Sequence, residues 1–122
     1  DEQRSLIEAA YKAQKDIIDM LRPGIPACDV AKFHIENVTK LGYGDWLLYG
    51  PCHGNGTMEG ETPWIETSSD YLLKENMAFC VDIFLGSAKT KTGLRIEDVV
   101  CITKDGVENL TNYPRKMFEI EC

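Results

Sequence analysis

The most constraining feature of this sequence is the segment at residues 77–85, which is apolar except for Asp82. A short apolar run between turn residues is typical of a strand that the fold buries. Residues 94–103 form a second candidate strand, which carries Arg95, Glu97 and Asp98, after a polar turn at residues 86–93. The turn Lys104-Asp105-Gly106 is a strong hairpin signal, because Asp-Gly suits the tight turns between antiparallel strands. We therefore predict antiparallel strands at residues 77–85, 94–103 and 107–110.

Two helices are predicted before these strands. Within residues 2–22, apolar side chains recur at spacings of three and four and therefore share one helical face: Leu6, Ala10, Ala13, Ile17 and Leu21. Arg22-Pro23-Gly24 ends this helix, because proline cannot continue it. A second helix is predicted at residues 28–41, in which His34 is expected to be a packed core residue and not a ligand. Two helices followed by antiparallel strands predict a single α+β domain over residues 1–122.

Composition excludes some classes of function. The 13 Lys and Arg residues are scattered and the net charge is −7, so no basic patch for nucleic acid is expected. No apolar run approaches the ~20 residues that a membrane-spanning helix needs. The five cysteines form no C-x-x-C pair, which favours reduced thiols in a cytoplasmic protein over a disulfide framework.

Three residues stand out as candidates for chemistry. His53 lies among glycines in Cys-His-Gly-Asn-Gly, on a predicted open loop that would present its imidazole to a metal or substrate. Asp82 lies inside an apolar strand, where a carboxylate needs a partner or a metal to remain charged. In the next strand, alternation places Arg95 and Glu97 on one face and Asp98 on the other.

Each candidate has a plainer alternative. These are a surface histidine in a turn, a half-exposed strand with Asp82 facing water, and a surface salt bridge between Arg95 and Glu97. Taken together, one imidazole and two carboxylates form a donor set that suits Mn, Zn, Co or Fe(II). Three such ligands suffice for one open metal site, whereas two metals need further carboxylates.

Five short motifs in register resemble one known family. The family's patterns and their places here are H-G-x-G at residues 53–56, E-x-P at 61–63, L-K-x-x-M-x-F-x-x-E at 73–82 with Asp82 in the last position, G-x-R-I-E-D at 93–98, and V-T-x-D-G-x-E-x-L-T at 102–111 with Ile102 in the first position. Their order and spacing resemble the second half of the pita-bread metallohydrolases, which include Xaa-Pro aminopeptidase, prolidase, creatinase and methionine aminopeptidase. The resemblance implies that the chain is the C-terminal part of a pita-bread catalytic domain.

The same resemblance implies a site and a reaction. Two divalent ions, manganese first and otherwise Zn, Co or Fe, would activate a water that attacks an Xaa-Pro peptide bond. His53 would bind one metal, Glu97 would bridge both, and Asp82 would take the place of a glutamate ligand. His53 and Glu97 are thus the candidate catalytic residues, and Arg95 and Glu61 are the candidate substrate-binding residues. The expected partner is a small peptide or another small molecule.

The chain departs from the family pattern in three places. The family's two aspartate ligands come from an earlier hairpin that this sequence does not contain, and Asp82 is one methylene shorter than the usual glutamate. Gly60 occupies the position at which the peptidase members carry a second histidine. The alternatives are a creatinase-like hydrolase of another C–N bond and a non-catalytic domain of the same fold. The isolated chain is predicted to be inactive, and an exposed sheet edge would favour a homodimer.

Overall fold

The computed structural model describes residues 2–120 of the chain. Two long helices, α1 (Glu2–Met20) and α2 (Ala27–Lys40), are followed by the short 3-10 helix η1 (Gly44–Trp46). Five strands follow: β1 (Cys52–Gly54), β2 (Glu61–Ile65), β3 (Ala78–Ser87), β4 (Thr92–Ile102) and β5 (Val107–Asn109). This order confirms the predicted α+β class, in which two helices precede antiparallel strands.

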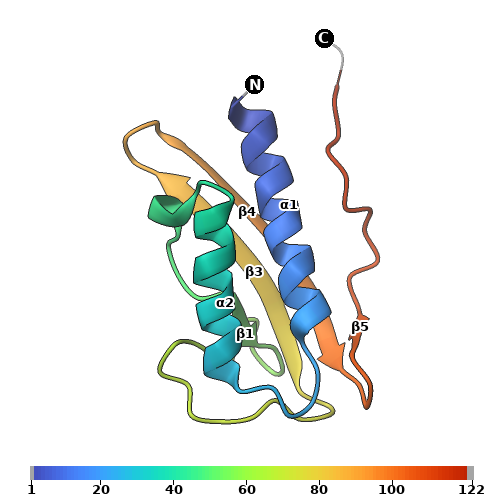
Figure 1. Cartoon of the computed structure of the whole chain (residues 1–122). Coiled ribbons are helices and arrows are strands. Elements are labelled where there is room, and N and C mark those ends of the chain that lie inside the picture. The colour runs from blue at the N-terminus through green and yellow to red at the C-terminus, as the bar shows by residue number, and fades with distance from the viewer. Residues whose placement is uncertain (1, 121–122) are drawn as a thin grey trace.

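All the strands belong to one sheet in the order β2-β1-β3-β4-β5, and every neighbouring pair is antiparallel. The long β3–β4 hairpin forms the centre of the sheet. Its paired residues run from Ala78 and Cys101 at one end to Ser87 and Thr92 at the other. Helices α1 and α2 lie side by side across one face of this sheet (Figure 1). The other face therefore carries no helix from the described residues.

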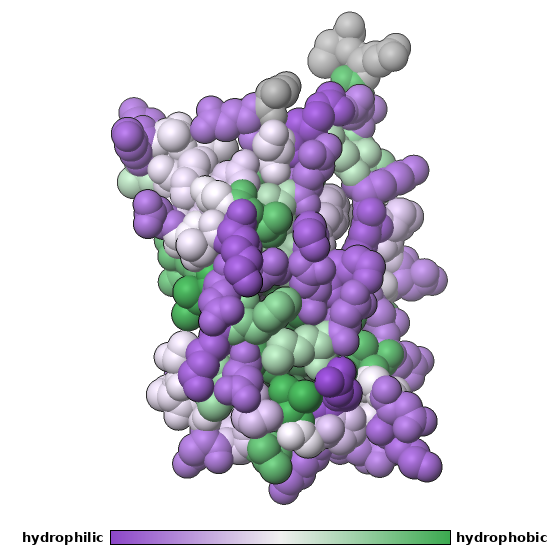
Figure 2. Space-filling view, viewed as in Figure 1, coloured by the Kyte–Doolittle hydropathy of each residue, from purple (hydrophilic) through white to green (hydrophobic). Residues whose placement is uncertain are grey.

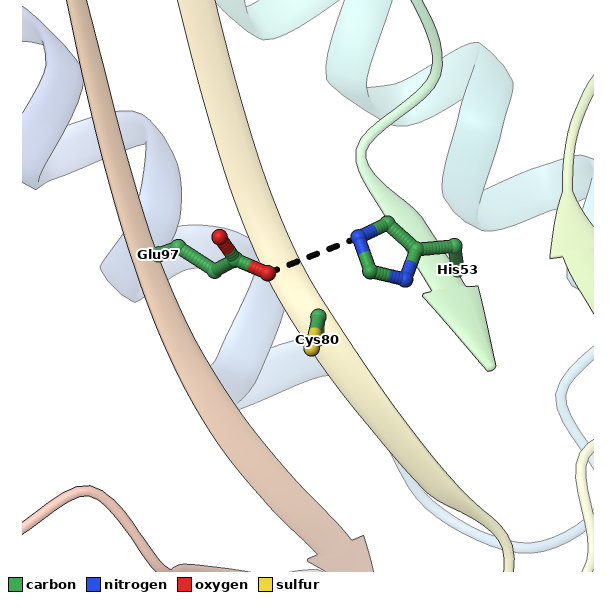
Figure 3. A group of neighbouring side chains, drawn as sticks. All are labelled: His53, Cys80 and Glu97. Carbon is green, nitrogen blue, oxygen red and sulfur yellow. Dashed lines mark ion pairs between the residues drawn. The ribbon is translucent and has the colours of Figure 1, made fainter. Parts of the chain in front are cut away.

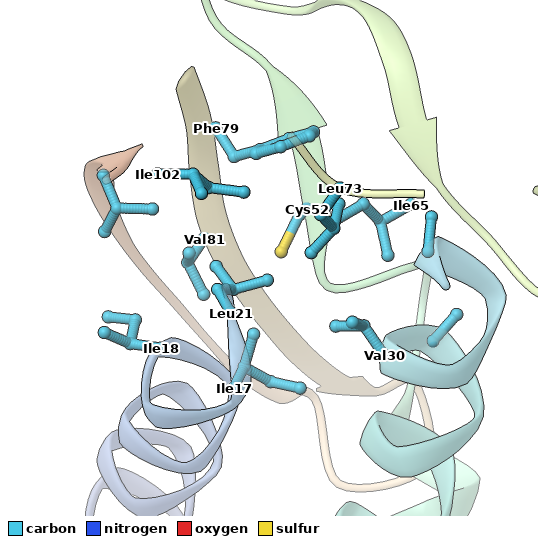
Figure 4. Close-up of a cluster of buried hydrophobic side chains, with 13 residues drawn as sticks. Ile17, Ile18, Leu21, Val30, Cys52, Ile65, Leu73, Phe79, Val81 and Ile102 are labelled. Atoms are coloured by element: carbon cyan, nitrogen blue, oxygen red, sulfur yellow. The ribbon is translucent and has the colours of Figure 1, made fainter. Parts of the chain in front are cut away.

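The core lies between the helices and the sheet. The predicted apolar stripe of α1 is confirmed, because all five of its side chains are buried: Leu6, Ala10, Ala13, Ile17 and Leu21. Ile17 and Leu21 pack with Phe79 and Val81 of β3, which have no exposed surface (Figure 4). The other three pack with Ile83 and Leu85, further along the same strand. The outer surface of the helices is mainly hydrophilic, with smaller apolar areas between the charged side chains (Figure 2). Both helices are thus amphipathic and are held by packing of their apolar faces.

Strand β1 is the main difference from the prediction. His53 was expected on an open loop, yet Cys52 and His53 lie in β1 and are buried. Likewise, no strand was predicted at residues 61–65, which form β2. Both strands are short, and β1 is held on its two sides by β2 and β3. Cross-strand pairing, and not a local apolar pattern, therefore determines these strands.

The turns and the tail complete the fold. The predicted turn at residues 86–93 is too long, because β3 continues to Ser87 and β4 begins at Thr92. The segment after β5 has no regular structure over most of its length and runs back beside α1 (Figure 1). There the Tyr11 hydroxyl donates a hydrogen bond to the carbonyl of Lys116 at 3.3 Å. Asp98 binds Arg115, which holds the tail against β4.

Three further predictions can be compared with the structure: the state of the cysteines, the apolar length of the helices and the burial of His34. Four cysteines within residues 2–120 are free thiols: Cys28, Cys52, Cys80 and Cys101. Cys122 lies outside the described residues. Neither α1 nor α2, the long helices of the described segment, has the apolar length to cross a membrane. His34 is 1% exposed, which confirms the prediction that it is a packed residue of α2.

Candidate metal centre

Strand register brings the predicted site residues to the face of the sheet that the helices leave uncovered. His53 on β1 lies opposite Cys80 on β3, and Asp82 on β3 lies opposite Glu97 on β4. Residues directly opposite each other in antiparallel strands project to the same face. Arg95 shares this face because it precedes Glu97 by two positions on β4. His53, Asp82, Arg95 and Glu97 therefore lie on the same face of the sheet.

The tightest group on this face consists of His53, Cys80 and Glu97, one from each of three neighbouring strands (Figure 3). One donor atom from each lies within 4.8 Å of the others. The Nε2 atom of His53 is 3.4 Å from Oε1 of Glu97. This Oε1 atom is buried and accepts no hydrogen bond from any residue in the described part of the chain. An imidazole, a thiol and a carboxylate oxygen without a hydrogen bond suit a divalent cation.

The predicted ligand Asp82 has other partners. It is 2% exposed, so the alternative that it faces water is wrong. Arg95 binds both carboxylate oxygens, from Nε to Oδ1 at 3.1 Å and from Nη2 to Oδ2 at 3.0 Å. The Tyr49 hydroxyl donates a further hydrogen bond to Oδ2. These contacts provide the partner that a buried carboxylate needs, so Asp82 can stay charged without a metal.

Arg95 connects the carboxylates of this face. Besides Asp82, its Nη2 atom lies 3.0 Å from Oε2 of Glu97 and 3.5 Å from Oε1 of Glu59. The hydrogen bonds to Asp82 hold the pKa of the guanidinium above its usual range. Because Arg95 takes Oε2 of Glu97, the other oxygen of that carboxylate remains directed toward His53.

Burial changes the ionisation of the uncharged groups around the site. Burial, together with the nearby carboxylates of Glu97 and Glu59, raises the pKa of the Cys80 thiol to about 12. Burial also raises the pKa of Tyr49, and its hydrogen bond to Asp82 acts in the same direction. Both groups are therefore protonated at neutral pH unless a cation displaces the proton.

A cavity of about 400 Å³ opens beside this cluster. Its walls include the aromatic rings of Tyr49 and Trp64, with Asp82, Arg95 and His53 among its polar groups. The rings of Trp64 and His53 have centroids 5.5 Å apart. The cavity thus joins the donor cluster to an aromatic surface on which an apolar side chain or ring can rest.

Glu61 and Gly60 lie at the start of β2 and just before it. A Glu61 oxygen accepts a hydrogen bond from the Met58 amide at 3.0 Å, so this carboxylate holds the preceding loop. A β-carbon at Gly60 would lie 3.9 Å from Nδ1 of His53 and 3.8 Å from the Trp64 ring. Position 60 is therefore beside the site, and a side chain there would reach it.

Four residues of the site were not among the predicted site residues: Tyr49, Glu59, Trp64 and Cys80. Cys80 had a signal, since it precedes Asp82 by two positions and strand alternation puts both on one face. Tyr49 and Glu59 lie in connecting segments that touch the site only after the strands have assembled. No local sequence pattern predicts that residues of a connecting segment will contact the site.

Two helices packed on an antiparallel sheet are the arrangement expected for part of a pita-bread domain, and comparison with known proteins agrees. The family model described as metallopeptidase family M24 matches residues 1–104. The Xaa-Pro dipeptidase of Pyrococcus furiosus is 32% identical over 117 residues, which cover 96% of this chain and 33% of that protein. The Xaa-Pro dipeptidase of Lactobacillus helveticus is 33% identical over 119 residues, with coverage of 96% and 32%.

Solved structures give the same result. The crystal structure of the prolidase from Pyrococcus horikoshii superposes with a TM-score of 0.88 at 28% identity, covering 96% of this chain and 33% of that one. The chain belongs to metallopeptidase family M24, which confirms the resemblance drawn from the five motifs. The chain spans about a third of the length of the relatives it matches.

Proposed function

We propose that the protein containing this chain is a metal-dependent hydrolase that cleaves Xaa-Pro peptide bonds, and that residues 1–122 form a single domain, the C-terminal portion of a catalytic domain. The observation that carries this proposal is the contact between His53 and Glu97, whose buried Oε1 atom lies 3.4 Å from the imidazole beside a cavity. Relatives named Xaa-Pro dipeptidase favour this function over a creatinase-like hydrolase.

The donor set fits a divalent metal ion. His53, Asp82 and Glu97 stay the predicted ligands, and two ions, with manganese as the first candidate and Zn, Co or Fe as alternatives, stay the predicted cofactor. A bound divalent ion would supply Lewis acidity, which activates water and polarises the scissile carbonyl. His53 and Glu97 are supported by their mutual contact. Asp82 would reach an ion only after giving up Arg95 and Tyr49.

The residues of the chain have distinct roles in this proposal. Arg95 fixes the Glu97 carboxylate through Oε2 and leaves Oε1 directed toward His53, which lines the cavity. Arg95 is itself half-exposed, with free surface that could bind a substrate carboxylate, as predicted from the resemblance. Tyr49 and Trp64 form an aromatic wall against which a prolyl ring can pack. For Glu61, a role in substrate binding stays a prediction.

Location and assembly are further proposals. We infer a cytoplasmic location, which is supported by the free thiols of Cys28, Cys52, Cys80 and Cys101. Association of two copies also stays a prediction. The short edge strand β5 supports it, because unpaired backbone groups at a sheet edge can accept another strand.

The test uses the purified full-length protein and a dipeptide of the Xaa-Pro type, with the same dipeptide ending in alanine as the control substrate. We expect hydrolysis of the Xaa-Pro dipeptide, loss of activity after chelation, and recovery when manganese is returned. His53→Ala is expected to lower kcat/KM by about 10³-fold, or about 4 kcal/mol of transition-state stabilisation. Glu108→Gln, an exposed change on β5, should leave the rate unchanged. Absence of metal-dependent Xaa-Pro hydrolysis would contradict the proposal.

A further inference from the structure

A second cavity, of about 350 Å³, lies beside helix α2. His34 and Ile35 of α2 form part of its wall, and the connecting segments 47–50 and 66–68 form much of the rest. Tyr49 belongs to the walls of both this cavity and the one at the metal centre. The predicted metal ligands do not line the second cavity, so its chemistry is that of a different set of residues.

The buried imidazole of His34 lacks a partner. The side chain is 1% exposed, and its Nδ1 atom is buried with no hydrogen-bond partner within residues 2–120. Buried polar atoms are normally hydrogen-bonded, and an unpaired one costs free energy. An apolar side chain would pack at this position without that cost. The missing partner of His34 therefore points to a ligand in the cavity that His34 lines.

The charge of the wall favours a cation. Glu66 is exposed and lines the cavity, and its carboxylate has no ion pair within the described residues. Burial lowers the pKa of His34 to about 4, so the imidazole is neutral at pH 7 and adds no positive charge. No hydrogen bond within residues 2–120 fixes a proton on Nδ1 of His34, so this nitrogen can accept a hydrogen bond from a ligand.

The rim of the cavity is apolar. Ile35, Leu48 and Tyr49 are 46%, 54% and 43% exposed, although each has a large apolar side chain. All three line the same hollow. Apolar side chains that gather around a hollow are typical of a surface that binds an apolar group. A ligand that fits this wall therefore combines an apolar part with a positive charge.

The sheet holds both connecting segments of the wall. Leu47 forms a β-bridge with β3, and a β-carbon at Gly50 would lie 2.6 Å from a carbonyl oxygen of β2. Only glycine permits this close approach. In the other segment, the Glu66 amide donates a hydrogen bond to the Ser69 hydroxyl at 2.9 Å. The wall is therefore formed before a ligand arrives, which lowers the cost of binding.

We propose that this cavity is a second binding site, which takes a small organic cation with a primary ammonium group and an aromatic or branched apolar group. The ammonium group donates a hydrogen bond to His34, and the Glu66 carboxylate balances its charge. The apolar group rests against Ile35, Leu48 and the ring of Tyr49. Binding here needs no metal ion, so the site does not depend on the proposed function.

The test is a titration of the purified full-length protein with phenethylamine, followed by NMR of isotope-labelled isoleucine and leucine methyl groups. We expect the signals of Ile35 and Leu48 to shift, with a dissociation constant on the order of 1 mM for so small a ligand. Phenethyl alcohol, which has a similar shape without the charge, should bind about 3-fold more weakly. Phenylacetate, which has the opposite charge, should not shift these signals. Equal affinity for the three compounds would overturn the assignment of a cation site.

Three variants distinguish this cavity from the one at the metal centre. His34→Leu removes the unpartnered nitrogen and should weaken phenethylamine binding about 10-fold. Ile35→Arg places a positive charge at an exposed position of the rim, so it should abolish the Leu48 shift without disturbing the fold. Trp64→Leu changes the wall of the metal-centre cavity and not of this one, and should leave the Ile35 and Leu48 shifts unchanged.

Two outcomes would overturn the site itself. Binding that is lost in Trp64→Leu and unaffected in His34→Leu and Ile35→Arg would place the amine at the metal centre. Absence of the Ile35 and Leu48 shifts in the unmodified full-length protein would mean that another part of that protein covers the cavity. Xaa-Pro hydrolysis by the same samples bears only on the proposed function, because amine binding is read from the methyl signals alone.

Discussion

The two faces of strand β3 differ in what they contribute to the molecule. Its inward residues, Phe79, Val81, Ile83 and Leu85, are at most 1% exposed and pack with the helices. Its outward residues include Cys80 and Asp82, which belong to the polar cluster and the cavity wall. Cys80 and Asp82 are buried as well, although the face that carries them is polar. Strand alternation lets one segment stabilise the fold and carry chemistry, with adjacent residues assigned to different tasks.

The polar face is stabilised in a different way from the apolar one. On the inward face, burial of apolar area is itself favourable. On the outward face, each buried polar group needs a partner, and Asp82 finds its partners in Arg95 and Tyr49. Glu97 is the exception, because one of its oxygens is buried without a hydrogen bond among the described residues. A ligand that binds this oxygen would therefore add more stability here than elsewhere on the outward face.

The largest expected difference between the faces is the cost of truncating a phenylalanine. Phe79→Ala should lower the free energy of unfolding by about 3–5 kcal/mol, because it leaves a cavity in the core. Phe84→Ala, on the outward face of the same strand, removes a partly exposed ring that contacts Tyr49 and should cost about 1 kcal/mol. Urea denaturation of the two variants measures the contrast. Equal losses would mean that the outward face is packed as tightly as the core.

The inward face was the predictable part of this fold. The stripe of α1 and the apolar run of β3 follow from local periodicity, and both lie where the sequence predicts them. Strands β1 and β2 were missed because each is short and is defined by pairing with a neighbour. A three-residue strand such as Cys52–Gly54 has no period of its own to detect.

The outward face was predictable only in its residue types. His53 and Glu97 stand out by motif, and they do come into contact. The partners of Asp82 could not be derived, because Arg95 lies diagonally across β3 and β4, and this relation requires the strand register. Tyr49 reaches Asp82 from a connecting segment. Tertiary contacts between distant segments leave no local pattern in the sequence.

A pH-dependent loss of stability is expected on the helix side of the molecule. Burial lowers the pKa of His34 from 6.5 to about 4. As the pH falls, the unfolded chain therefore binds a proton at His34 before the folded chain does. The contribution of neutral His34 to the free energy of unfolding is fully present above pH 6.5, is lost as the pH decreases toward 4, and does not change below that. The whole change amounts to about 3 kcal/mol.

The matched variant for this prediction is His34→Leu, which removes the ionisable group and keeps an apolar side chain at a buried position. Urea denaturation between pH 4 and pH 7 should give a steeper decline for the unmodified protein than for the variant. If the free energy of unfolding fell equally with pH in both proteins, His34 would not account for the acid sensitivity. The acid sensitivity would then be assigned to the polar face.

The smallest of the expected effects concerns the pair that holds the polar face together. Arg95→Met keeps the apolar stem but removes the charge that faces buried Asp82, leaving that carboxylate with Tyr49 alone. Loss of one partner of a fully buried pair typically costs about 3–5 kcal/mol, and the half-exposed position of Arg95 reduces this to about 2 kcal/mol. Arg22→Met, at an exposed position, is the control and should change stability by less than about 0.5 kcal/mol.

In the Arg95→Met background, Asp82→Asn should restore part of the lost stability, because no uncompensated charge remains. If Asp82→Asn instead destabilised both backgrounds equally, the two side chains would be energetically independent, and the polar face would owe its order to backbone pairing alone.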